Sequence, residues 1–262
     1  MRGRLLLILA SMFVLSAGMG ACHGSSPSGT AAPTQAAGSS PAPTGTQPPQ
    51  EKTYENRTWG IAVAYSADWR GPEVYETESS LTFEVGTDVV YPYGTSREDR
   101  VYTKENSYYI TLQYNKKPAD AALAEYESDQ PWMVQYLSLL SLSDGDSVSS
   151  PRSVVTRVRS VGVGPFSGAE FISTLPESAQ TERFYVREVI LINDNYDAIR
   201  VAGSPNNVIV QDARNWQADY EAVDRDNLAT FRRFVDSISV GSSEENVSGI
   251  QPLDGSHKRW RQ

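Results

Sequence analysis

The chain has 262 residues and carries 23 Lys and Arg against 32 Asp and Glu, a formal net charge of −9 at pH 7. An acidic chain of this kind is unsuited to nucleic acid, whose phosphates attract basic proteins. Its single cysteine excludes a disulfide framework within the chain, so the folded part must depend on its hydrophobic core.

The N-terminus has the parts of a secretory signal peptide over residues 1–21. Arg2 and Arg4 supply positive charge, and residues 5–17 form an apolar stretch that is shorter than a membrane-spanning helix. The letters GAC that end at Cys22 resemble the lipobox of bacterial lipoproteins, in which cleavage precedes a cysteine that is then lipidated. This resemblance implies lipidation at Cys22. The alternative is a secreted protein with a free thiol.

Two further segments are predicted to lie outside the folded part. After its cysteine, the segment 22–50 consists of Ser, Pro, Ala, Gly, Thr and Gln with one His, and it carries no charge. Such a composition cannot offset the entropy cost of ordering, so we expect a disordered tether. Residues 241–262 are expected to be a disordered tail. The chain is therefore expected at the bacterial cell membrane, lipid-anchored and facing the extracytoplasmic side.

A folded domain is predicted over residues 51–240, where charged, aromatic and β-branched residues appear together. This range has 18 Lys and Arg against 29 Asp and Glu, a net charge of −11, which we interpret as favouring solubility. Apolar residues alternate with polar ones in several stretches, as they do in strands with one buried face. Strands are predicted at 61–65, 81–85, 108–114, 154–161, 168–175, 183–192 and 196–202.

Helical spacing and one turn complete the predicted fold. The polar turn at 193–195 is typical of an antiparallel hairpin. Helices are predicted at 118–128, 131–142 and 228–238 from Pro at a first turn and from apolar stripes. Many strands with few helices indicate an α+β fold, an antiparallel β-sheet with helices packed on it.

Short aromatic motifs mark both ends of the predicted domain. They are Tyr54, Trp59, Gly60, Tyr65 and Trp69 near the start, and Phe231, Phe234, Ser237 and Ile238 near the end. These motifs resemble those of the PsbP-like domains, the family of an extrinsic photosystem II subunit and of many bacterial lipoproteins. The resemblance implies an αβα sandwich and a role in binding or assembly. Metal sites of the photosynthetic members use histidine, and residues 51–240 contain none, so no metal site is carried over.

The catalytic groups of common hydrolases are missing from the predicted domain. His23 lies in the tether and His257 in the tail, which argues against Ser-His or Cys-His catalysis and against zinc sites built on imidazole. No motif for a cofactor is present. Carboxylates alone could still perform general acid–base chemistry on a glycan, although no pair stands out from the sequence.

The stretch 86–106 is longer than an ordinary hairpin loop and mixes tyrosine with arginine. Exposed Tyr and Arg are favoured at binding surfaces, so the stretch is a candidate binding loop. The alternative is that the tyrosines pin the loop to the sheet. The candidate residues are Tyr91, Tyr93, Arg97, Arg100 and Tyr102.

Two functions remain open at this point. The first is a non-catalytic, membrane-tethered binding or assembly module whose partner is an envelope protein or glycan. The second is a glycan-directed envelope hydrolase that uses carboxylates only. A cleft with two carboxylates of raised pKa would favour the enzyme, whereas a shallow aromatic surface would favour the module.

Overall fold

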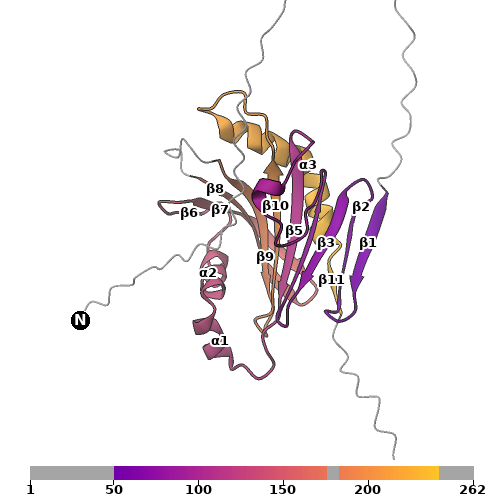
Figure 1. The fold of residues 1–262 in the computed structure, drawn as a ribbon. Coiled ribbons are helices and arrows are strands. Elements are labelled where there is room, and N and C mark those ends of the chain that lie inside the picture. The colour runs from indigo at the N-terminus through magenta and orange to yellow at the C-terminus, as the bar shows by residue number, and fades with distance from the viewer. Residues whose placement is uncertain (1–49, 176–182, 242–262) are drawn as a thin grey trace, which may run out of the picture.

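The computed structural model describes residues 50–175 and 183–241, which form two antiparallel sheets with three α-helices (Figure 1). The signal peptide, Cys22, the tether before residue 50 and the tail after residue 241 lie outside these described residues. In the described ranges, no helix is long and apolar enough to cross a membrane.

The larger sheet has eight strands, and every neighbouring pair is antiparallel. The strands are β3 (Arg70–Glu76), β4 (Ser80–Gly86), β5 (Ser107–Asn115), β6 (Ser147–Ser149), β7 (Val154–Val163), β8 (Phe166–Thr174), β9 (Tyr185–Ile192) and β10 (Ala198–Asn206). Their order across the sheet is β3-β4-β5-β10-β9-β8-β7-β6.

The smaller sheet joins the two ends of the described chain. Its strands are β1 (Glu51–Asn56), β2 (Ile61–Ser66) and β11 (Ser239–Val240), with β2 in the middle. The Ser237 hydroxyl accepts the Ala64 N–H at 2.9 Å, and the Gly241 N–H donates to the Gly60 carbonyl at 2.8 Å. The C-terminal end of the domain is therefore held against its first hairpin.

Helices lie on both faces of the larger sheet. The helices α1 (Leu123–Asp129) and α2 (Pro131–Leu140) lie on one face of this sheet (Figure 1). The smaller sheet of β1, β2 and β11 lies on the other face (Figure 1). The long helix α3 (Trp216–Asp236) shares this second face, because its buried Phe231 and Phe234 belong to the same core as the inner residues of β2. Pro131 stands at the first turn of α2, where its missing N–H is not needed.

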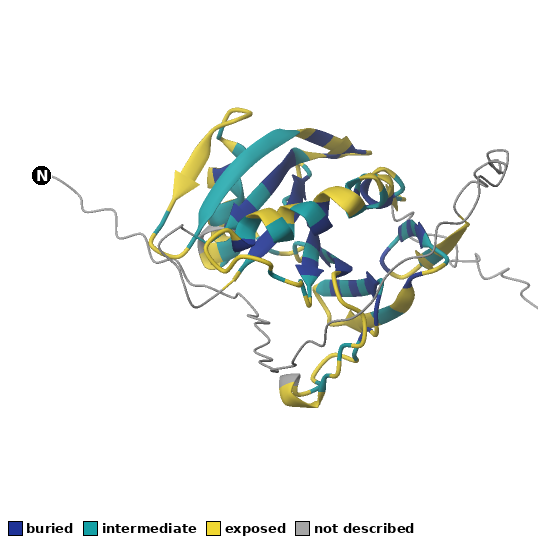
Figure 2. Ribbon diagram, turned by 90° about the horizontal axis from the view of Figure 1, so that it is seen from above, coloured by how far each residue is buried: buried dark blue, intermediate teal, exposed yellow. Residues whose placement is uncertain are grey.

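Buried and less buried residues alternate along the strands (Figure 2). The buried residues on the two faces of the larger sheet belong to separate cores. The main core lies between the larger sheet, α3 and the smaller sheet, where β4 contributes Leu81, Phe83 and Val85. On the opposite face, α2 buries Met133 and Leu139 in two smaller clusters. Because strand side chains alternate between faces, β8, β9 and β10 supply residues to both cores.

The predicted α+β class is confirmed, and so is the hairpin around residues 193–195. There the Asn193 side-chain oxygen accepts the N–H groups of Asn195 and Asp197, both at 2.9 Å, which closes the turn between β9 and β10. Polar side chains that satisfy backbone N–H groups locally are what such turns require.

Two helix predictions were wrong in their bounds. The helix expected from residue 118 begins at Leu123, because the Lys117 ammonium donates to the carbonyls of Pro118 and Ala121, which lie in a turn. The last helix begins at Trp216 rather than at residue 228, since its first half is polar and its apolar stripe is sparse there. The strands β1, β3 and β6 were not predicted.

Candidate binding surface beside the loop between β4 and β5

A buried carboxylate closes the base of the loop formed by residues 87–106. Asp88 is only 4% exposed, and it accepts the N–H groups of Thr103 and Lys104 and the Thr103 hydroxyl, each at 2.9 Å. Burial alone would raise the pKa of Asp88, but these hydrogen bonds to the charged form outweigh burial and lower it. The long loop therefore has a fixed base.

Tyr91 and Tyr102 hold the body of this loop together. The Tyr91 hydroxyl accepts the Val101 N–H and donates to the Val101 carbonyl, both at 2.6 Å. The ring of Tyr102 lies edge-on to Tyr91 at 5.8 Å and to Tyr109 of β5 at 6.0 Å. For these two predicted residues the structure favours the role of pinning the loop to the sheet.

Tyr93 is placed differently, at the surface beside the edge strand β3. Its side chain is 40% exposed, and its ring lies 5.5 Å from that of Tyr75, which is 50% exposed. The planes of the two rings are tilted by 35°. Two large aromatic faces are therefore offered to solvent side by side.

Charged groups lie around this aromatic pair. Glu73 and Glu84 are direct partners in the pairing of β3 with β4, as Tyr75 and Thr82 are, so all four residues share one face of the sheet. Arg100 from the loop donates through Nη2 to the Thr95 carbonyl at 3.2 Å, while its buried Nε has no hydrogen-bond partner in the described structure. We call Tyr75, Tyr93, Glu73, Glu84 and Arg100 the tyrosine-pair surface.

The environment shifts the pKa values of two of these groups. Burial raises the pKa of Glu84, and the nearby charge of Glu73 adds to the shift, whereas a hydrogen bond from Thr111 and the charge of Arg100 act against it. Burial also raises the pKa of Tyr93, and the charge of Glu84 adds to this effect. Tyr93 is therefore a neutral hydrogen-bonding group at physiological pH.

The structure places the residues of the candidate binding loop in different environments. Tyr93 and Arg100 belong to the tyrosine-pair surface, and Tyr91 and Tyr102 stand behind it as supports. Arg97 lies in the short helical turn η1 (Arg97–Asp99), and its side chain is outside the described part of the structure. Tyr75 and Glu73 were missed, because β3 carries Gly71 and Pro72 and shows no clear alternation of apolar residues. Glu84 was missed because the sequence of β4 does not show which of its polar residues lies opposite Glu73.

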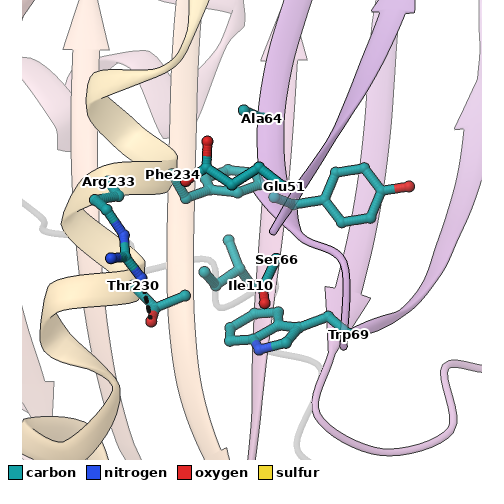
Figure 3. A pocket seen from close by; sticks show the side chains of 9 residues that line it. Glu51, Ala64, Ser66, Trp69, Ile110, Thr230, Arg233 and Phe234 are labelled. Atoms are coloured by element: carbon teal, nitrogen blue, oxygen red, sulfur yellow. Dashed lines mark hydrogen bonds between the residues drawn. The ribbon is translucent and has the colours of Figure 1, made fainter. Parts of the chain in front are cut away.

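Two hollows lie elsewhere on the described part of the domain. A cavity of about 10 Å³ between β2 and α3, beside Trp69 and Arg233, has room for about one water molecule (Figure 3). An open depression of about 470 Å³ lies beside β7 and β8. Its Arg157 already donates to Asp144, to the Leu140 carbonyl and to Ser160. The first hollow is too small for a ligand larger than water, and the arginine of the second is already engaged.

No arranged set of metal ligands is found among the described residues. Within residues 50–175 and 183–241, no group of three or more His, Cys, Asp or Glu side chains is placed to hold a metal ion. A surface with exposed aromatic faces and a rim of charged hydrogen-bonding groups is suited to recognition.

Comparison with known proteins adds no relative. No protein-family model matches the chain, and no curated protein resembles it at a significant level. The function is therefore inferred from the residues themselves.

Proposed function

We propose that this chain is a membrane-tethered, extracytoplasmic lipoprotein whose PsbP-like domain is a non-catalytic binding or assembly module of the cell envelope. The signal-peptide pattern that ends at Cys22 supports the anchor, and the uncharged segment 22–50 supports a tether. Helices on both faces of the antiparallel sheet are compatible with the αβα sandwich of the family.

The observation that carries the binding role is the exposed pair of Tyr75 and Tyr93 on a braced loop. Aromatic faces provide contact area at a small cost in conformational entropy, and rigid support reduces the ordering cost of binding. Glu73, Glu84 and Arg100 add acceptors and donors at the rim. The partner is an envelope glycan or protein whose apolar face covers the two rings while its polar groups meet this rim.

Partner capture by the mature protein tests this proposal. We expect Tyr75→Ala with Tyr93→Ala to reduce capture of isolated envelope glycan or envelope protein at least about tenfold, because interface aromatics are frequent hot spots. The matched variant Tyr75→Phe with Tyr93→Phe keeps both ring faces and should retain most of the capture. Equal capture by the Ala variant and the wild type would contradict the proposed surface.

The alternative function, a carboxylate-only hydrolase, has one specific observation in its favour. Glu84 is a carboxyl group whose pKa is raised by burial, and Glu73 lies opposite it on the neighbouring strand. A raised pKa is what a general acid requires. If this function holds, Glu84→Gln should abolish release of sugar from envelope glycan. The binding module should show no such release in either form.

A further inference from the structure

The face of the larger sheet that α3 covers, opposite to the tyrosine-pair surface, carries a group of arginines around one buried carboxylate. Glu170 of β8 has no exposed surface, and it accepts hydrogen bonds from Arg159 of β7, Arg187 of β9 and Arg232 of α3. Arg159 Nε lies 2.6 Å from Glu170 Oε2. Arg232 lies 3.3 Å from the same oxygen through Nε and 3.1 Å from Oε1 through Nη2.

The inner part of this group is complete. Arg187, whose side chain is 7% exposed, donates from Nε and Nη2 to Asp224 of α3 at distances of 2.5 to 3.1 Å. Asp224 also accepts the hydroxyls of Tyr108 and Tyr185, at 3.0 and 3.1 Å. Asp224 therefore neutralises Arg187, and each donor nitrogen or hydroxyl of this inner part has an acceptor.

The outer part is not balanced. Arg159 and Arg232 are each 37% exposed, and both share the single negative charge of Glu170. The whole group has three positive charges against two negative ones, within a domain whose net charge is −11. Burial alone would raise the pKa of Glu170, but the hydrogen bonds from Arg232 and Arg159 outweigh burial and lower it. The carboxylate therefore stays charged and keeps both guanidinium groups in place.

Free donors remain on both exposed arginines. Among the described residues, Arg159 donates only through Nε, which leaves Nη1 and Nη2 without an acceptor. Arg232 donates through Nε and Nη2, and no described residue accepts from its Nη1. The Nε atoms of both arginines bond the same oxygen of Glu170, at 2.6 and 3.3 Å. Glu170 thus holds two partly exposed guanidinium groups close to one another, with terminal donors that no described residue bonds.

From this geometry we propose that Arg159 and Arg232 form a binding site for a phosphoryl group, on the α3 side of the sheet. A phosphoryl group has several acceptor oxygens and can bond two guanidinium forks at once. Its negative charge removes the excess positive charge of the group. Since Glu170 already orders both side chains, little conformational entropy is lost when the anion binds.

The phosphoryl group has two sources that the same chemistry would serve, a free phosphate or phosphate ester and the headgroup of an anionic lipid. The site is independent of the tyrosine-pair surface, because Arg159, Glu170 and Arg232 lie on the other face of the sheet. Failure of one proposal therefore leaves the other untouched.

Titration of the full mature protein with inorganic phosphate and pyrophosphate at low ionic strength tests the site. We expect saturable binding that Arg159→Gln and Arg232→Gln each weaken about tenfold or more, as loss of a charge-assisted hydrogen bond does. Arg233→Gln is the matched control, because Arg233 is exposed on the same helix and bonds only Thr230 in the described structure. An equal loss in the control, or no saturable binding by the wild type, would overturn the proposal.

A second pair of variants separates binding from folding. Arg159→Lys and Arg232→Lys keep the positive charge near Glu170 but lose the bidentate fork, so we expect native thermal unfolding with weakened phosphate binding. Lys variants that fold normally and bind phosphate as well as the wild type would refute the assigned role of the guanidinium groups.

Vesicles distinguish the two sources. The Cys22→Ala protein, which lacks the proposed acyl anchor, is sedimented with vesicles of phosphatidylglycerol in phosphatidylcholine and with phosphatidylcholine alone. Binding to the anionic vesicles that pyrophosphate displaces, and that Arg159→Gln removes, assigns the site to lipid headgroups. Saturable phosphate binding without vesicle binding assigns it to a soluble phosphate. Absence of both contradicts the site.

Discussion

At the scale of single residues, Asp88 joins the two ends of the loop between β4 and β5. Its two carboxylate oxygens accept three donors from Thr103 and Lys104. An Asn side chain at this position has only one acceptor oxygen, and its NH₂ group would face the donors of Thr103 and Lys104. The order of the whole loop therefore depends on one charged group.

We predict that Asp88→Asn lowers the free energy of unfolding by about 1–3 kcal/mol, the cost of leaving buried donors unsatisfied. The folded-state pKa of Asp88 lies below its ordinary value, so its contribution is present above about pH 4 and is lost as the pH falls through the folded pKa. Denaturant unfolding at pH 7 and in acid measures both effects. Asp68→Asn, at an exposed position, should change stability by less than about 0.5 kcal/mol.

Glu84 leads to the opposite pH dependence. Burial raises the pKa of Glu84 in the folded state. Above that pKa, the cost of burying the charged carboxylate lowers the free energy of unfolding. This cost disappears at low pH, where the group is protonated in both the folded and the unfolded state. Glu84→Gln should therefore raise the Tm at pH 7, and the gain should shrink as the pH falls towards 4. A gain of 1 kcal/mol corresponds to about 2–4 °C in a domain of this size. A Tm difference that is constant from pH 4 to 8 would argue against this origin.

At the scale of elements, the tyrosines of the loop between β4 and β5 have two roles: some hold the loop together, and one is exposed at the surface. Tyr91 makes two hydrogen bonds to Val101 and contacts Tyr102, whereas Tyr93 is exposed beside Tyr75. We predict that Tyr91→Ala costs about 1–3 kcal/mol of stability, while Tyr93→Ala costs less than about 1 kcal/mol. Thermal unfolding of the two single variants compares them directly. Equal losses would show that Tyr93 also serves as a support.

Much of the sheet could be predicted because its strands have a strict alternation with a buried face. In β4, three alternating residues face the main core, namely Leu81, Phe83 and Val85. This alternation can be recognised in the sequence without knowing which strands pair with β4. β3 offers no such pattern, since it is an edge strand with Gly71 and Pro72, and few of its residues are buried. Tyr75 and Glu73 of the tyrosine-pair surface were therefore not predicted.

The arginine group was invisible in the sequence for a different reason. Arg159 and Arg232 are separated by a long stretch of chain, and only the pairing of β7 with β8 and the position of α3 bring both to Glu170. A register shift between Arg157 and Arg159 turns these two side chains to different partners, Asp144 and Glu170. Local periodicity carries no information about such a shift.

At the scale of the whole molecule, the domain is closed by its last residues. Ser237 bonds the backbone of Ala64, β11 pairs with β2, and Gly241 bonds Gly60. The hydrophobic residues that α3 buries lie just before these contacts in the chain, so the end of the chain is held beside the main core.

We predict that a protein of residues 50–241 unfolds in one cooperative transition as a soluble monomer, without metal or reductant. Removal of residues 237–241 should lower its Tm by several degrees, because the bonds to Ala64 and Gly60 and the β11 pairing are lost. Differential scanning calorimetry compares the two proteins. A broad transition for residues 50–241 would place the domain boundary elsewhere.

The last prediction concerns the anchor. A lipid chain contributes about 0.8 kcal/mol per buried CH₂, and a single chain gives only marginal membrane binding, so a diacylated Cys22 would hold the chain firmly. We predict that Cys22→Ala releases the protein from the membrane fraction and abolishes labelling by a fatty-acid analogue, because this cysteine is the only one in the chain. Thermal unfolding of the domain should not change, since the segment 22–50 is predicted to be a tether. Undiminished labelling of Cys22→Ala would rule out this cysteine as the site of lipid attachment.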